Sequence, residues 1–123
     1  MAIANIRAVV LDCPDPRGLA EFYRALVGGD IVQNEPSWVR LRDGKHVALA
    51  FQRVDDYRPP QWPSAERPQQ LHIDVTVDDV DRAEREVLAL GAAKHDVQPG
   101  DDGASGFRVF LDPAGHPFCL CWD

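Results

Sequence analysis

Two stretches of the chain show the hydrophobic spacing of an amphipathic helix. In residues 9–29 the apolar stripe recurs at i, i+3, i+4 and i+7, and consists of Leu19, Phe22, Tyr23 and Leu26. In residues 72–92 the corresponding stripe consists of Val80, Ala83, Val87 and Leu90. An aspartate precedes each predicted helix and a glycine lies near its end, as a left-handed helix cap requires. The two stretches therefore follow one plan, in which Asp79 of the second matches Asp15 of the first.

The segments around both helices predict the same set of strands. A strand precedes each helix, near residue 9 and at residues 71–77, and a short strand follows it, at residues 31–33 and 93–97. Each repeat then predicts a hairpin: residues 38–41 with 46–52 in the first, and residues 108–111 with 118–122 in the second. Asp43-Gly44 and Asp112-Pro113-Ala114-Gly115 supply the turns. The predicted fold class is α+β, built from two β-α-β-β-β modules.

The segment between the two repeats is rich in proline. Because proline cannot donate a hydrogen bond to a strand ladder, residues 54–68 are predicted to be a linker. We therefore expect a single domain over residues 1–123, with a first module at about 1–53 and a second module at 69–123. Trp62 in the linker either packs this segment onto the body of the protein or contacts a ligand.

Charge and composition exclude several classes of function. The 123 residues include 13 Lys and Arg and 20 Asp and Glu, and the formal net charge is -7. Because nucleic-acid affinity depends on clustered basic side chains, we expect no nucleic-acid partner. No apolar run is long enough to span a bilayer and no secretory signal is visible, so we expect a cytoplasmic protein with no membrane partner. Residues 65–123 hold 5 basic and 12 acidic side chains, which accounts for the whole net charge.

Alternation along the strands assigns one face to the packing side and the other to a cavity. In residues 71–77, Ile73, Val75 and Val77 alternate with His72, Asp74 and Thr76. The apolar set must pack on the helices, so the polar set lines the opposite face. Alignment of the repeats extends this cavity face to Ala8, Val10, Asp12, Ala48, Ala50, Gln52, Cys119 and Cys121, and strand parity adds Trp38 and Arg40. Val47 and Trp122 are assigned to the helix side, and all three cysteines are expected to be reduced.

The motifs of the repeat resemble a known superfamily. They are similar to motifs of the glyoxalase/bleomycin resistance/dioxygenase superfamily, which is also called the vicinal oxygen chelate superfamily. The matching segments are residues 12–16 (DCPDP) with 20–23 (AEFY), residues 78–81 (DDVD) with 90–92 (LGA), and residues 111–118 (LDPAGHPF). The resemblance covers nearly the whole chain. It implies curved mixed sheets, or half-barrels, with the helices outside, and a homodimer.

The resemblance also implies a position for a divalent metal ion. Metal-dependent members use one His, Gln or Glu from each of four strands, and the matching positions here are Ala8, Ala48 or Ala50, His72 and Cys119. Because alanine offers no donor atom, we expect no metal cofactor at the usual site. A rearranged site formed by His72, Cys119 and Cys121 stays an alternative, with Asp74 as a further ligand, since imidazole and thiolate suit zinc.

Two hypotheses about function follow. The first is that the protein binds a small organic molecule without the usual metal, through Val10, Asp12, Trp38, Arg40, Ala48, Ala50, Gln52, Trp62, His72, Cys119 and Cys121. The second is an enzyme of the same superfamily (a lyase, isomerase, cyclase or dioxygenase) that uses His72 with Asp74 for proton transfer, with or without a divalent metal. The remaining histidines, His46, His95 and His116, are expected at the surface, the last near a pocket rim.

Overall fold

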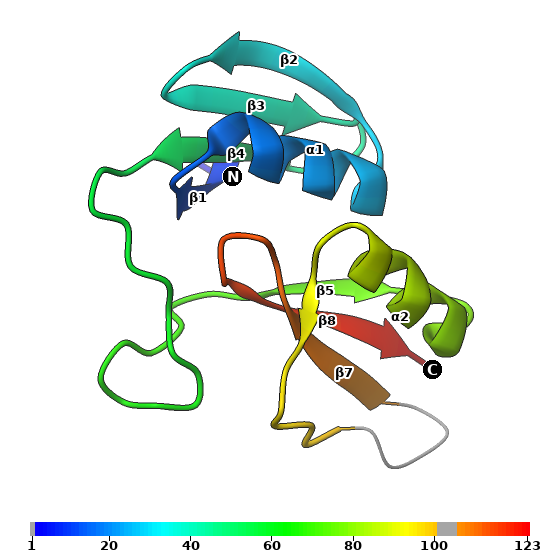
Figure 1. Cartoon of the computed structure of the whole chain (residues 1–123). Coiled ribbons are helices and arrows are strands. Elements are labelled where there is room, and N and C mark those ends of the chain that lie inside the picture. Colours follow the sequence, from blue (N-terminus) through cyan, green and yellow to red (C-terminus); the bar gives the residue numbers. More distant parts are fainter. Residues whose placement is uncertain (1, 101–105) are drawn as a thin grey trace. The chain divides into compact units, whose positions relative to one another are not determined.

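The computed structural model describes residues 2–100 and 106–123 of the chain. The chain forms two compact units, Met1–Tyr57 and Arg58–Asp123. Each unit contains one helix and one open, four-stranded mixed sheet, and the elements follow one another in the order β-α-β-β-β (Figure 1). The α+β fold class and the two-module order predicted from the sequence are therefore confirmed.

The first unit is built around the helix whose apolar stripe the sequence shows. Its elements are β1 (Ala8–Cys13), α1 (Pro16–Val27), β2 (Asp30–Glu35), β3 (Trp38–Arg42) and β4 (Ala48–Arg53). The strands lie in the order β1-β4-β3-β2, and β1 runs parallel to β4. The Asp15 carboxylate accepts a hydrogen bond from Gly18 N at 3.1 Å and so caps α1. The buried Tyr23 ring of α1 stacks on Phe51 of β4, with 5.7 Å between ring centroids.

The second unit repeats this plan with a shorter helix. Its elements are β5 (Ile73–Thr76), α2 (Val80–Ala89), β6 (Ala93–Lys94), β7 (Gly106–Leu111) and β8 (Pro117–Trp122). The strands lie in the order β5-β8-β7-β6, and β5 runs parallel to β8. Asp79 caps α2 by accepting a hydrogen bond from Arg82 N at 3.1 Å. Phe110 and Phe118 stack in the core with 5.8 Å between ring centroids.

The strand predicted at residues 93–97 is shorter than expected. The regular pairing of β6 with β7 ends at Lys94, after which His95 N still donates to Val109 O at 3.0 Å and the side chain of Gln98 supplies the further hydrogen bonds to β7. Gln98 Nε2 donates to Val109 O at 2.7 Å, and Val109 N donates to Gln98 Oε1 at 2.8 Å. The carboxamide therefore satisfies both backbone groups of one residue, and periodicity alone does not reveal this substitution of side chain for strand.

Three further expectations need correction. The strand predicted at residues 46–52 begins at Ala48, because the Asp43 carboxylate binds His46 N at 2.8 Å and holds that residue in the turn. Val47, assigned to the helix side, consequently lies outside the strand and is 45% exposed. Leu90, assigned to the apolar stripe of α2, follows the last helical residue and is 41% exposed.

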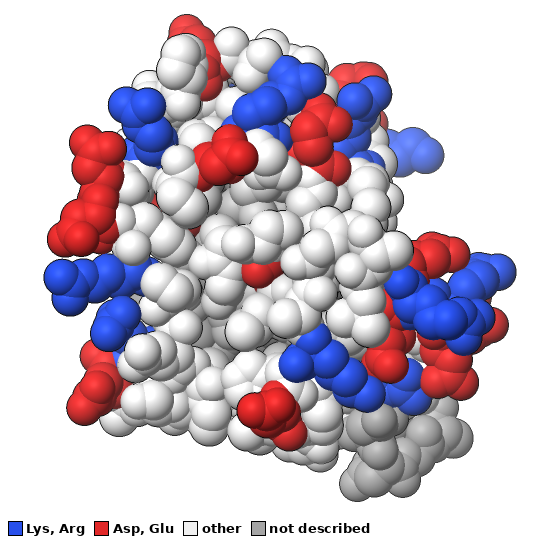
Figure 2. Space-filling view, viewed as in Figure 1, with Lys and Arg blue, Asp and Glu red and all other residues white. Residues whose placement is uncertain are grey.

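Acidic and basic side chains intermingle over α2 (Figure 2). Arg108 reaches Asp81 at 3.0 Å and Glu84 at 3.3 Å, and Lys94 reaches Glu84 at 3.1 Å. The acidic surplus of the second half is thus partly paired on the helix side of the sheet. Within the described residues, no helix is long and apolar enough to cross a membrane.

Candidate functional site

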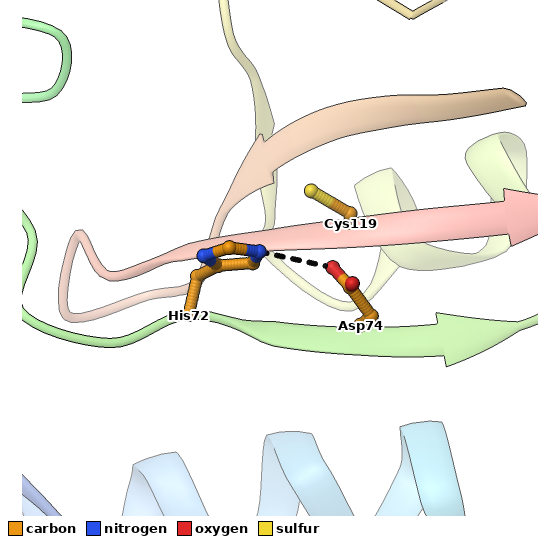
Figure 3. A group of neighbouring side chains, drawn as sticks. All are labelled: His72, Asp74 and Cys119. Atoms are coloured by element: carbon orange, nitrogen blue, oxygen red, sulfur yellow. Dashed lines mark ion pairs between the residues drawn. The ribbon is translucent and has the colours of Figure 1, made fainter.

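Three polar side chains, from β5, from β8 and from the residue that precedes β5, meet on the face of the second sheet that lies away from α2. Asp74 of β5 is the direct register partner of Cys119 of β8, and His72 lies two residues before Asp74, so it points to the same side. His72 Nε2 lies 3.2 Å from Asp74 Oδ1 (Figure 3). The potential ligand atoms of the three residues lie within 4.8 Å of one another. Alternation in residues 71–77 therefore predicted the shared face of His72 and Asp74 correctly.

These residues line a pocket of about 310 Å³ within the second unit. Its walls are His72, Asp74, Gly106, Phe107, Cys119, Cys121, Trp122 and Asp123. The His72 and Asp74 side chains are 43% and 59% exposed, whereas Cys119 is buried at the base. The pocket therefore offers an imidazole and a carboxylate to solvent beside aromatic and thiol groups.

Four of the lining residues were absent from the sequence-based site. Phe107 is the register partner of Cys121 and thus shares its face, but the strand that carries it was predicted to begin one residue later, at Arg108. Trp122 was assigned to the helix side. The Arg108 guanidinium lies 5.7 Å from its ring centroid, and Trp122 also reaches the pocket at the end of β8. If the strand had been predicted to begin one residue earlier, alternation would have placed Phe107 on the cavity face.

Burial and negative charge keep both thiols of the pocket protonated. Burial, followed by the charge and hydrogen-bond acceptance of Asp74, raises the pKa of Cys119 to about 12. The pKa of Cys121 is also raised, first by burial and then by the carboxylates of Asp74 and Asp123. Since a thiolate is the reactive form of cysteine, neither residue is an activated nucleophile at neutral pH.

The site residues predicted in the first half of the chain share one face of the first sheet. The register of β1, β4 and β3 aligns them in three rows across the sheet. These rows are Asp12, Gln52 and Trp38; Val10, Ala50 and Arg40; and Ala8 with Ala48. The Trp38 indole donates to Gln33 Oε1 at 3.1 Å. The repeat alignment therefore grouped these residues on a common face, and they lie in the first unit, whereas the pocket of about 310 Å³ is lined by the second.

The remaining predicted residues have structural partners. Trp62 contacts the ring of His95 edge to face at 5.1 Å, and its carbonyl lies 2.9 Å from His95 Nε2. This contact matches the packing alternative for Trp62. His116 was expected near a pocket rim, but its ring lies 2.8 Å from the buried Asp112 carboxylate, within the turn that precedes β8. His46 makes the equivalent contact with Asp43 at 2.7 Å in the first unit.

Comparison with known proteins identifies the family. A family model for a glyoxalase-like domain matches residues 8–121. The chain belongs to this family. The family that the resemblance of the repeated motifs implied is thus confirmed. No curated protein matches the chain.

Solved structures of this glyoxalase-like fold resemble the chain over nearly its whole length. An enzyme of the glyoxalase/bleomycin resistance protein/dioxygenase family from Burkholderia phytofirmans PsJN is 18% identical with a TM-score of 0.74, covering 97% of this chain and 98% of that one. A glyoxalase-related enzyme from Fulvimarina pelagi is 16% identical with a TM-score of 0.70, covering 98% and 89%. A glyoxalase family protein from Enterococcus faecalis is 18% identical with a TM-score of 0.69, covering 98% and 99%. At these identities the likeness shows the fold.

The usual metal site of the superfamily does not fit the residues of this glyoxalase-like chain. Ala8 and either Ala48 or Ala50 stand at two of the four ligand positions, and methyl side chains donate no electron pair. Of the other two, His72 is a suitable ligand, whereas Cys119 must first lose a proton whose pKa is raised to about 12. Asp74 lies beside His72 and Cys119. The usual site, however, takes one ligand from each of four strands, and only two of the four matching positions in this chain carry a side chain with a donor atom.

Proposed function

We propose that this glyoxalase-like protein binds a small organic molecule in the pocket of the second unit, without the metal centre usual in its superfamily. The observation that carries the proposal is the composition of that pocket. The aromatic side chain of Phe107 and the solvent-accessible side chains of His72 and Asp74 line the same pocket of about 310 Å³. Small-molecule sites characteristically combine apolar walls with a few convergent polar groups in a cavity of this size.

The charge state of the pocket supports binding rather than covalent chemistry. Cys119 and Cys121 remain thiols near neutral pH because burial and the nearby carboxylates disfavour the thiolate. They therefore contribute small, polarizable surface to the base of the site. The alanines at two of the usual metal positions leave recognition to side chains of the protein itself.

A second candidate function rests on the contact between His72 and Asp74. With 3.2 Å between Nε2 and the carboxylate, a neutral imidazole that donates from Nε2 leaves its Nδ1 as a proton acceptor. A carboxylate that orients an imidazole in this way is the arrangement of a general base. The exposed His72 ring is accessible to a substrate, so the same pocket suits a metal-free isomerase or lyase that removes a proton from its substrate.

A binding experiment tests the leading proposal. Isothermal titration with a panel of small aromatic and heteroaromatic compounds is expected to find saturable binding with one site per chain. Phe107→Ala removes the aromatic wall and should weaken binding by at least tenfold, about 1.4 kcal/mol, whereas His46→Ala in the first-unit turn should leave it unchanged. Absence of saturable binding across the panel, or equal weakening by both variants, would contradict the proposal.

Two further measurements separate the alternatives. Elemental analysis of protein purified without chelator is expected to find no stoichiometric divalent metal, and a full equivalent of bound metal would contradict the metal-free site. If the protein turns over a ligand found in the panel, His72→Ala should abolish turnover under the enzyme hypothesis. Unchanged turnover in that variant would exclude His72 as the base.

A further inference from the structure

The ionised side chains that line the pocket of the second unit are acidic. Asp74 and Asp123 contribute carboxylates, and no Lys or Arg is among the eight described residues of its wall. His72 adds an imidazole to the same wall. The Asp74 side chain is 59% exposed, so its carboxylate is accessible to a ligand. The pocket thus offers acceptor oxygens with net negative charge.

Two basic side chains carried by this sheet, Arg108 and Lys94, are engaged with acidic residues of α2. Arg108 extends from β7 toward α2, where it lies 3.0 Å from Asp81 and 3.3 Å from Glu84. Lys94 pairs with the same glutamate at 3.1 Å. These contacts direct two of the five basic side chains of residues 65–123 toward the helix. They therefore leave the negative potential of Asp74 and Asp123 without a basic side chain in the pocket wall.

The two thiols of the pocket lie close enough to these carboxylates to be affected by their charge. Beyond the effect of burial, Asp74 raises the pKa of both Cys119 and Cys121, and Asp123 raises that of Cys121. Negative charge at the base of the pocket is thus disfavoured by the neighbouring carboxylates, and positive charge there is favoured by the same interaction. An anionic ligand would experience the repulsion that the thiolates experience.

The aromatic wall adds a second preference. Phe107 shares the face of Cys121, whereas the Trp122 ring at the end of β8 already has the Arg108 guanidinium 5.7 Å from its centroid, so Phe107 is the aromatic side chain offered to a ligand. Aromatic faces attract cations as well as apolar groups. The negative charge of Asp74 and the neighbouring aromatic surface therefore favour one kind of ligand, in which a cationic group is attached to an apolar or aromatic body.

We propose that the pocket of the second unit selects small organic cations, namely protonated amines attached to an aromatic or apolar group, with Asp74 as the residue that determines this specificity. This inference rests on the proposed binding function and names its ligand class. The ammonium N–H groups donate to the exposed Asp74 carboxylate, and the apolar part packs on Phe107. His72 contacts the same carboxylate at 3.2 Å.

A matched ligand series tests the charge preference directly. Benzylamine, benzyl alcohol and benzoate share an aromatic ring and differ in charge, and each is titrated calorimetrically into the full chain at low, constant ionic strength. We expect benzylamine to bind at least tenfold more tightly than the other two, a difference of about 1.4 kcal/mol. Added salt should reduce this preference, because screening weakens the attraction of partly exposed charges.

Two charge-matched variants assign the preference to Asp74. Asp74→Asn should reduce benzylamine binding by at least tenfold and leave benzyl alcohol binding within twofold of wild type. Asp96→Asn removes the same charge from an exposed position outside the pocket wall, and should preserve the benzylamine preference. The amide proton spectrum of each variant verifies that the fold is intact.

The outcomes distinguish this inference from the function on which it rests. If benzyl alcohol or benzoate binds wild-type protein as tightly as benzylamine does, the pocket binds small molecules and the cation preference is wrong. If Asp96→Asn weakens benzylamine binding as much as Asp74→Asn does, the preference comes from the net charge of the protein and not from a contact with Asp74. The role assigned to Asp74 is then wrong. If neither this series nor the wider aromatic panel shows saturable binding, the proposed function itself fails.

Discussion

The protonation of Cys119 offers a test of the site that needs no ligand. A thiol with an ordinary pKa of 9.0 is about one-tenth ionised at pH 8, whereas a thiol with a pKa of about 12 is ionised at the level of about one molecule in ten thousand. Because iodoacetamide reacts with the thiolate, alkylation of Cys119 in the folded protein should be about a thousandfold slower than that of an unhindered model thiol.

The variant Asp74→Asn removes the acceptor charge beside Cys119 while keeping a side chain of the same size. Burial is the larger cause of the raised pKa and remains in the variant, so we expect partial recovery of reactivity, by about tenfold, which corresponds to about one pKa unit. Peptide mass spectrometry after timed alkylation at pH 8 resolves Cys119 from Cys121 and from the fully buried Cys13, whose rate should not change.

Two results would refute this reasoning. Alkylation of Cys119 in wild-type protein at the rate of a model thiol would show that the thiol is not protected at the base of the pocket. Equal rates in wild-type protein and Asp74→Asn would show that the carboxylate does not act on the thiol. A parallel increase at Cys13 in the variant would indicate general unfolding, and denaturant titration of both proteins checks for it.

Two further predictions concern stability and are measured by urea unfolding. Gln98→Ala should lower the free energy of unfolding by about 2 kcal/mol, because it leaves the N–H of Val109 without its partner and removes one of the two hydrogen bonds to the Val109 C=O, which keeps the bond from His95 N. A change below about 0.5 kcal/mol would contradict the role of this carboxamide. Asp112→Ala should cost about 2 to 3 kcal/mol, because the buried carboxylate accepts hydrogen bonds from two backbone N–H groups. The matching Asp43→Ala should cost less, since its turn is exposed to solvent, and the reverse order would contradict the argument from burial.

The internal repeat shows why much of the fold was predictable from the sequence. Helix stripes and strand alternation are properties of neighbouring residues, so Leu19 to Leu26 and residues 71–77 carry their own evidence. The presence of two copies strengthened each assignment, because Asp15 and Asp79 cap their helices in the same way. The shared face of His72 and Asp74 followed from alternation alone.

The ends of the elements depend on contacts that the local pattern does not contain. Gln98 replaces the last part of a strand only because it lies opposite Val109, which is 11 positions away in the sequence. The strand that begins at Ala48 starts late because the Asp43 carboxylate binds the backbone of His46. In each case a side chain competes with the backbone ladder for the same hydrogen-bonding groups, and the winner depends on tertiary distance.

The sequence by itself therefore determined the order of the elements and the shared face of residues such as His72 and Asp74, because these depend on residue type and short-range spacing. The tertiary structure decided which of the face residues form a pocket. It joined His72 and Asp74 to Cys119 through the register of β5 and β8, and added Phe107 and Asp123. It also set the pKa of the thiols, because burial and the distance between charges exist only after the strands have paired.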